Sequence, residues 1–114
     1  MTPEQRLAAV RSHLEKRPDD PFVRYALAMA LRSAGDLAGA VLELRELARR
    51  TPDYVPTYLM LGQALELRGE DAGALDAYEA GLGAARRRGD GHAERELAAA
   101  AEGLRARGIR GTTA

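Results

Sequence analysis

The sequence contains no cysteine and no tryptophan, and only five of its 114 residues are aromatic. Without cysteine there can be no disulfide framework, iron–sulfur cluster or thiol nucleophile. Valine and isoleucine together also number only five, which argues against a sizeable sheet because strands favour β-branched and aromatic side chains. The longest uninterrupted apolar run, residues 25–31, is seven residues long, whereas a membrane-spanning helix needs about 20. We therefore expect neither a β-rich fold nor a membrane segment.

The abundant residues are alanine, leucine and arginine, at 23, 16 and 16 copies. All three are strong helix formers, and the length fits one domain. The 17 basic and 17 acidic residues cancel to a net charge of zero. The N-terminal segment lacks the basic stretch followed by an apolar stretch that marks a secretion signal. These features predict a single all-α domain that is soluble and cytoplasmic.

The sequence repeats itself at an offset of 34 residues, between positions 18–51 and 52–85. This period is typical of repeats built from two helices and a turn. Asp20 followed by Pro21 is a favourable helix start, and Gly35 is a favourable helix end. The identical pairs are Pro18/Pro52, Asp19/Asp53, Leu27/Leu61, Ala30/Ala64, Leu31/Leu65, Gly35/Gly69, Ala38/Ala72, Gly39/Gly73 and Ala40/Ala74.

The two units resemble the tetratricopeptide repeat (TPR) family, whose members are α-solenoids of antiparallel helix hairpins. The resemblance rests on large apolar, small and glycine positions that recur in a set order. In the first unit these are Leu27, Ala28, Leu31, Gly35, Ala40, Leu44 and Pro52, and in the second Tyr58, Leu61, Gly62, Leu65, Gly69, Ala74 and Tyr78.

Four positions depart from the family pattern. Arg24 stands where a large apolar residue is usual, and Leu47 where alanine is usual. Gly81 and Arg86 replace an alanine and a proline in the second unit. The small residues that remain would let paired helices approach closely, so we expect Gly62 to face Ala74 and Ala28 to face Ala40.

Two repeats alone would be marginally stable, because an array needs about three units to bury a continuous core. The flanks supply further helices, the first of which starts with a capping box at Thr2 and Gln5. Leu7 and Val10 in that helix, like Leu27, Leu31 and Leu44 in the first repeat, are predicted to be buried. We expect six helices in one domain, 1–108: an N-terminal capping helix (1–17), repeat 1 (18–51), repeat 2 (52–85), a C-terminal capping helix (91–108), and then a disordered tail (109–114).

Residues that could carry chemistry are sparse. His13 and His92 are the only histidines, and Ser12 and Ser33 the only serines. Neither pair has the spacing of a metal site or of a nucleophile with its base. We therefore expect no catalytic residue, no metal and no cofactor, and the interpretation is that the protein is not an enzyme.

The TPR resemblance implies a concave groove lined by the first helix of each repeat. Tyr25 and Met29 stand where chaperone-binding members use lysine and asparagine to clamp a carboxylate, so that activity is not expected. The face is apolar, which favours a protein–protein interaction module, an adaptor or scaffold that binds a partner segment. The groove residues carried over are Phe22, Tyr25, Met29, Ser33, Pro56, Leu59, Met60, Gln63 and Glu66, with Leu67 at the end.

Two alternatives remain open at this stage. The same apolar face could close a homodimer. The basic cluster Arg86, Arg87 and Arg88 could bind an acidic partner, or nucleic acid as part of a larger assembly. Nucleic acid ranks lowest, because no aromatic residues interleave with these arginines to stack on bases.

Overall fold

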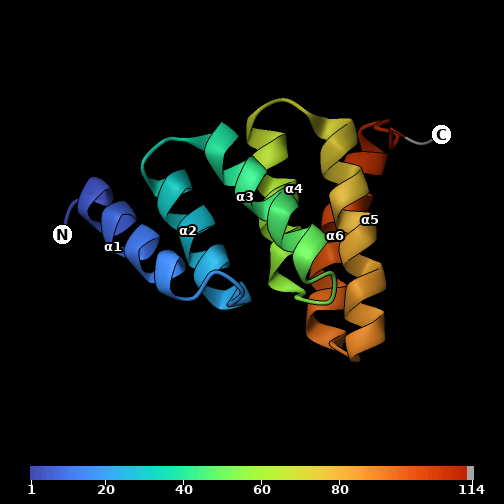
Figure 1. Cartoon of the computed structure of the whole chain (residues 1–114). Coiled ribbons are helices and arrows are strands. Elements are labelled where there is room, and N and C mark those ends of the chain that lie inside the picture. The colour runs from blue at the N-terminus through green and yellow to red at the C-terminus, as the bar shows by residue number, and fades with distance from the viewer. Residues whose placement is uncertain (113–114) are drawn as a thin grey trace.

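The computed structural model describes residues 1–112, which form six α-helices and no strand. Successive helices run antiparallel from one end of an elongated stack to the other, with overall extents of 40 × 29 × 23 Å (Figure 1). The all-α solenoid predicted from the sequence is therefore confirmed. The helices are α1 (Pro3–Lys16), α2 (Pro21–Ser33), α3 (Leu37–Arg50), α4 (Pro56–Leu67), α5 (Asp71–Arg88) and α6 (Gly91–Ala106).

The helix boundaries follow the local chemistry of the sequence. The capping box of α1 is complete, because Thr2 Oγ1 accepts from Gln5 N at 3.1 Å and Gln5 Oε1 accepts from Thr2 N at 2.8 Å. The Asp20 carboxylate accepts from the backbone N–H group two residues later, at 3.0 Å. Each hairpin turns at a glycine with positive φ, Gly35 at 87° and Gly69 at 76°, a conformation that residues with a Cβ rarely adopt.

The helices pack as two hairpins with one helix added at each end. α2 pairs with α3 and α4 with α5, while α1 packs on α2 and α6 packs on α5. The first helices of successive units, α2, α4 and α6, are also neighbours. The main buried core runs from α2 to α6, and a smaller cluster of Leu27, Leu31 and Ala40 lies beneath α1. This arrangement places three first helices along one face.

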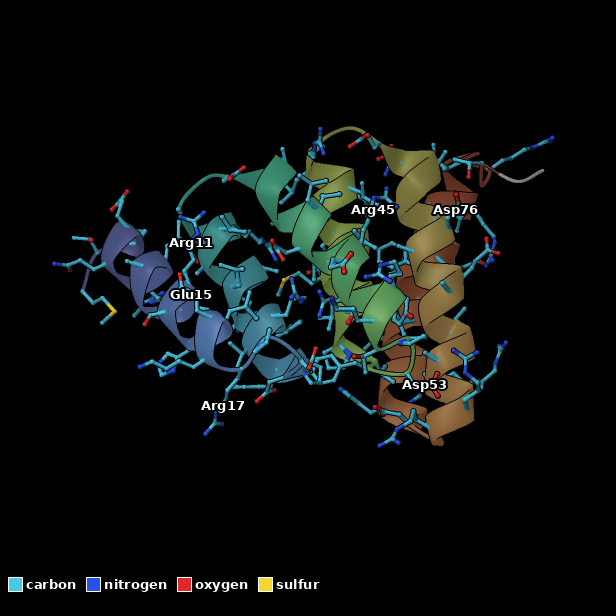
Figure 2. The ribbon with its side chains drawn as sticks, in the orientation of Figure 1. Arg11, Glu15, Arg17, Arg45, Asp53 and Asp76 are labelled. Carbon is cyan, nitrogen blue, oxygen red and sulfur yellow. The ribbon has the colours of Figure 1, made fainter. Side chains whose placement is uncertain are left out.

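Helix α1 is less buried than the sequence predicted. Leu7 and Val10 are half-buried, and no residue of α1 is buried, whereas Leu27, Leu31 and Leu44 are. The reason is that α1 packs against α2 alone. Its remaining faces carry exposed charged side chains, several of which are seen in Figure 2.

The sequence predicts that Gly62 faces Ala74, and in the structure the side-chain atoms nearest to Gly62 belong to Tyr78. A Cβ at Gly62 would lie 2.5 Å from Cζ of Tyr78, well inside van der Waals distance, so the ring of Tyr78 occupies the space above Gly62. The helices approach closely, as expected, but a tyrosine on α5 fills the gap. Tyr78 is itself 1% exposed, so the ring has little freedom to move aside.

The tail expected to be disordered from residue 109 is held against α5 over its first four residues. Ile109 packs against the main core. The backbone N–H group of Thr112 donates to both carboxylate oxygens of Asp76, at 3.1 and 3.2 Å, and its hydroxyl group also donates to Asp76. Residues 113–114 of the predicted tail lie outside the described residues.

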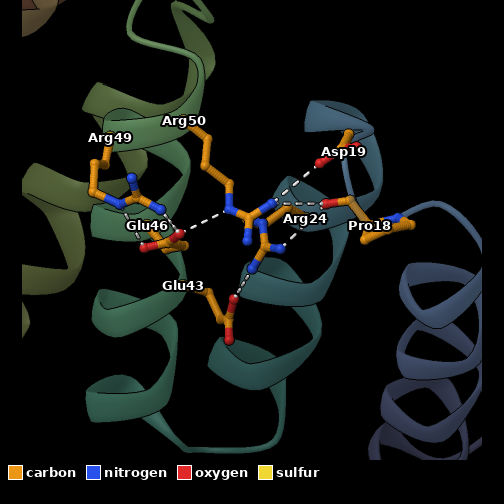
Figure 3. A network of polar contacts seen from close by, with 7 residues as sticks. All are labelled: Pro18, Asp19, Arg24, Glu43, Glu46, Arg49 and Arg50. Atoms are coloured by element: carbon orange, nitrogen blue, oxygen red, sulfur yellow. Dashed lines mark hydrogen bonds and ion pairs between the residues drawn. The ribbon is translucent and has the colours of Figure 1, made fainter.

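A polar network ties repeat 1 to the loop that enters it (Figure 3). Arg24 is only 8% exposed, and its Nη1 atom donates to Glu43 Oε1 at 2.7 Å. Arg50 Nη1 lies 3.3 Å from Asp19 Oδ1, and Arg50 Nε donates to Glu46 Oε1 at 2.7 Å. Charged groups thus take the place of apolar packing at this end of the first hairpin.

Candidate partner-binding groove

The first helices enclose a hollow on the face that they share. It has a volume of about 310 Å³ and is bounded by α2 on one side, α4 along the floor and α6 on the other side. That volume is at the lower end of the range typical of ligand pockets. The lining residues are Tyr25, Val55, Pro56, Leu59, Met60, Gln63, Asp90, His92, Ala93, Glu96 and Leu97. We call this hollow the groove cavity.

Five of the predicted groove residues line the cavity. Tyr25 comes from α2, and Pro56, Leu59, Met60 and Gln63 come from α4. Met60 is largely buried, whereas Leu59 and Tyr25 are partly exposed. The sequence therefore located the α2 and α4 sides of the cavity.

The other predicted groove residues lie outside the cavity lining. Phe22, Met29 and Ser33 are exposed on α2, Phe22 at 63% and Met29 at 40%. Glu66 is used within the fold, because its carboxylate accepts a hydrogen bond from the Tyr78 hydroxyl group and lies 3.8 Å from the Arg107 guanidinium.

Phe22 and Met29 are on α2 at the positions equivalent to two residues of α4 that line the cavity. Positions 34 apart occupy the same place in successive repeats, and Tyr25 and Leu59, one such pair, both line the cavity. Phe22 corresponds to Pro56, and Met29 corresponds to Gln63. Phe22 and Met29 therefore extend the same face along α2.

The α6 side of the groove was missed by the sequence reasoning. Asp90, His92, Ala93, Glu96 and Leu97 line the cavity there. α6 packs on α5 and neighbours α4, so it stands in the place of the first helix of a third repeat. The sequence predicts it as a capping helix beyond the two 34-residue units, and the predicted groove therefore ends at α4.

Polar groups on α6 are arranged around its first turns. The Asp90 carboxylate accepts from the Ala93 N–H group at 3.0 Å and so caps the helix. His92 Nε2 lies 3.0 Å from Glu96 Oε1, one helical turn further on. The Glu96 side chain is 48% exposed, so its carboxylate remains accessible from the groove.

An aromatic pair stands where α2 meets the loop before α4. The rings of Tyr25 and Tyr54 meet edge to face, with centroids 6.0 Å apart and an interplanar angle of 63°. Burial raises the pKa of Tyr25 above its ordinary value, and nearby Arg32 partly offsets this. Burial also raises the pKa of Tyr54. Both hydroxyl groups are protonated at neutral pH, as in any tyrosine, and can act as hydrogen-bond donors.

The basic cluster at the end of α5 is mostly engaged within the chain. Arg86 Nε lies 3.2 Å from Glu94 Oε2, and Arg87 Nε lies 2.8 Å from Asp53 Oδ1. Arg88 borders a separate hollow that also includes Asp53. Two of the three arginines thus join α5 to neighbouring segments.

Other kinds of site are not found in the part of the chain that the structure describes. Among residues 1–112 no group of three or more histidine or acidic side chains is placed to hold a metal ion. None of the described helices is long and apolar enough to span a membrane.

Comparison with known proteins places the chain among helical repeat proteins. No protein-family model matches it. A TPR repeat-containing protein of Pseudomonas aeruginosa is 35% identical over 84 residues, which cover 74% of this chain and 80% of that protein. One from Methanocaldococcus jannaschii is 36% identical over 70 residues, which cover 61% of this chain but only 22% of the much longer relative.

Solved structures agree with these relatives. A crystal structure of a tetratricopeptide repeat domain protein from Salinibacter ruber is 34% identical, with a TM-score of 0.72 over 76% of this chain and 97% of that one. A solution structure of a tetratricopeptide repeat domain protein from the same organism gives 36% identity and a TM-score of 0.73, over 76% and 88%. With the 34-residue period, the paired helices and these relatives all in agreement, the chain belongs to the tetratricopeptide repeat family.

Proposed function

We propose that this chain is a protein-interaction module that binds an apolar segment of a partner protein along the groove. The proposal rests on the location of the exposed apolar side chains. Among the described residues, five large hydrophobic side chains are exposed, and three of them, Phe22, Met29 and Leu67, are on the groove helices α2 and α4. Exposed apolar patches of this kind mark interaction sites.

Binding would remove this surface from water. The cavity offers Tyr25 and Leu59 to a partner side chain, while Phe22 and Met29 continue the apolar strip along α2. Aromatic anchors near the centre of an interface usually carry most of its binding energy. The role as an adaptor or scaffold follows from such binding, and action in the cytoplasm stays a prediction.

The test compares two exposed apolar positions on the groove with one elsewhere. The Phe22→Ser/Met29→Ser variant should melt like the parent chain, because both side chains are already exposed, yet lose the partners that the parent captures from its host cell. Leu42→Ser is the matched control, since Leu42 is 69% exposed on α3. Partners that bind the double variant as well as the parent would exclude the groove.

Homodimerisation through the same face is the alternative. It predicts that sedimentation of the purified chain shifts with concentration, and that Phe22→Ser/Met29→Ser removes the shift. The nucleic-acid alternative is less well supported, because Arg86 and Arg87 are paired with Glu94 and Asp53.

A further inference from the structure

The two sides of the groove differ in chemistry. The α2 and α4 sides supply apolar side chains and the neutral amide of Gln63, whereas the α6 side supplies Asp90, Glu96 and His92. Both acidic residues that line the cavity thus come from the α6 side, and no lysine or arginine is among the lining residues. Asp90 Oδ1 caps α6, and Glu96 Oε1 lies 3.0 Å from His92 Nε2. Because the Glu96 side chain is 48% exposed, its carboxylate can still meet a cation of a partner.

The basic residues near α6 are directed elsewhere. Arg105 Nη2 lies 3.3 Å from Glu79 Oε1, and Arg107 Nη2 lies 2.9 Å from Asp71 Oδ2, both on α5. The Arg95 guanidinium folds back over Gly91 in the first turn of its own helix. Arg105 therefore faces α5 and Arg95 lies beside the first turn of α6. Neither is among the residues that line the cavity, whereas Glu96 is.

Building on the proposed function, we propose that the bound segment is amphipathic and basic, with apolar side chains toward α2 and α4 and a lysine or arginine toward Glu96. Charge complementarity is the argument. A cation at that point would pair with a half-exposed carboxylate, whereas an acidic side chain would meet like charge. Exposed ion pairs add little affinity, so Glu96 acts mainly by selecting the partner and setting its orientation.

The first experiment finds groove-binding peptides without presupposing their charge. A library of random 12-residue peptides displayed on phage is selected against the full chain, and binders that also bind Phe22→Ser/Met29→Ser are discarded. The remaining peptides should combine apolar residues with lysine or arginine and carry net positive charge. Groove-dependent peptides that are neutral or acidic would overturn the inference and leave the proposed function standing. A selection that yields no groove-dependent peptide would count against both.

The second experiment locates the cation. For one enriched peptide, each basic residue is changed to glutamine and its dissociation constant is measured on the parent chain and on Glu96→Gln. One peptide position should lose about two- to fivefold in affinity on the parent chain and nothing on Glu96→Gln, the size expected for an exposed ion pair. Glu15→Gln is the control, because Glu15 is exposed on α1 and lies outside the cavity lining. Equal losses on the parent and Glu96→Gln at every position would exclude Glu96 as the partner of the cation.

Discussion

In repeat 1 the first helix is tied to the preceding loop by an arginine, and in repeat 2 by a tyrosine. Arg24 Nη2 donates to the carbonyl oxygen of Pro18 at 3.3 Å, and the Tyr58 hydroxyl group donates to that of Pro52 at 2.5 Å. The donors are 34 residues apart, as are the prolines. Two side chains of different chemistry therefore make the same connection.

The residues that surround Arg24 and Tyr58 differ in a way that suits each side chain. Arg24 is buried with Glu43 as its ion-pair partner, and the residue equivalent to Glu43 in repeat 2 is the buried Ala77. Tyr58 lies against Gly81, where an added Cβ would come within 2.5 Å of the Tyr58 Cβ. The equivalent position in repeat 1 is a leucine.

A second pair of positions follows the same rule. Repeat 2 combines Gly62 with the large ring of Tyr78, and repeat 1 has Ala28 and the smaller Leu44 in the equivalent places, all four being buried. The smaller residue on the first helix of repeat 2 is matched by a larger side chain on its second helix, as expected for a close-packed interior. A departure from the repeat pattern at one position thus predicts a compensating departure at its contact.

The largest expected effect comes from removing the helix that covers repeat 1. We propose that residues 1–17 act as a cap, because Leu7, Val10 and Leu14 lie over the small cluster that contains Leu27 and Leu31. Deleting them should lower the free energy of unfolding by about 2–4 kcal/mol, since three half-buried apolar side chains are lost and their partners are exposed. Urea denaturation measures this. A truncated chain as stable as the parent would mean that α1 does not cap the repeat.

The next effect tests the pair in repeat 2. Gly62→Ala should destabilise the chain by about 1–3 kcal/mol, because the new methyl group would overlap the buried ring of Tyr78. Thermal and urea denaturation measure the loss. Changing Tyr78 to leucine in the same chain reproduces the small pair of repeat 1 and should recover part of it.

A glycine with free space around it is the control for this comparison. Gly103 on α6 has no heavy atom near the position of an added Cβ. Gly103→Ala should therefore stabilise the chain by about 0.5–1 kcal/mol through helix propensity alone. If Gly62→Ala were stabilising as well, the ring of Tyr78 could not be in contact with Gly62.

A smaller effect is expected at the ion pair of repeat 1. Arg24 is buried, and Glu43→Ala removes its ion-pair partner while the hydrogen bond to Pro18 remains. The change should cost about 1–2 kcal/mol, because Glu43 itself is partly exposed. Adding Arg24→Met removes the stranded charge and should restore most of the loss. A double variant less stable than Glu43→Ala would show that Arg24 stabilises the fold through Pro18 alone.

The fold was predictable from sequence because the signal recurs. The 34-residue period, the turn glycines Gly35 and Gly69, and the capping box at Thr2 each report on local structure. Contacts between helices were less accessible: the sequence shows that Gly62 is small, but only the packed structure shows that Tyr78, sixteen residues later, fills the space.

The candidate site was predictable where the period holds and not beyond it. Tyr25 and Leu59 share a repeat position, so both were assigned to the groove. Glu96 is on α6, beyond the two 34-residue units, and Tyr54 lies in a loop, where no helical period applies. Only the structure therefore shows that the acidic residues of α6 line the groove.

The smallest effect concerns acid stability, which should differ between the repeats. Hydrogen bonds from Arg49 and Arg50 lower the pKa of Glu46 from 4.5 to about 2, and the equivalent residue in repeat 2 is Ala80. A lowered pKa favours the ionised carboxylate in the folded state. Its stabilising contribution is therefore complete above about pH 4.5 and is lost as the pH falls toward about 2.

Comparing the parent chain with Glu46→Gln isolates this contribution. Melting temperatures measured from pH 6 down to pH 2 should be slightly higher for the parent at pH 6, and the two curves should converge near pH 2. The difference is expected to be small, because the carboxylate is near the surface and its ion pairs are screened by solvent. Glu15→Gln, at an exposed site on α1, controls for the general loss of a negative charge. Curves that stay parallel down to pH 2 would show that Glu46 titrates alike in the folded and unfolded chains, and the arginines around it would then contribute nothing to acid stability.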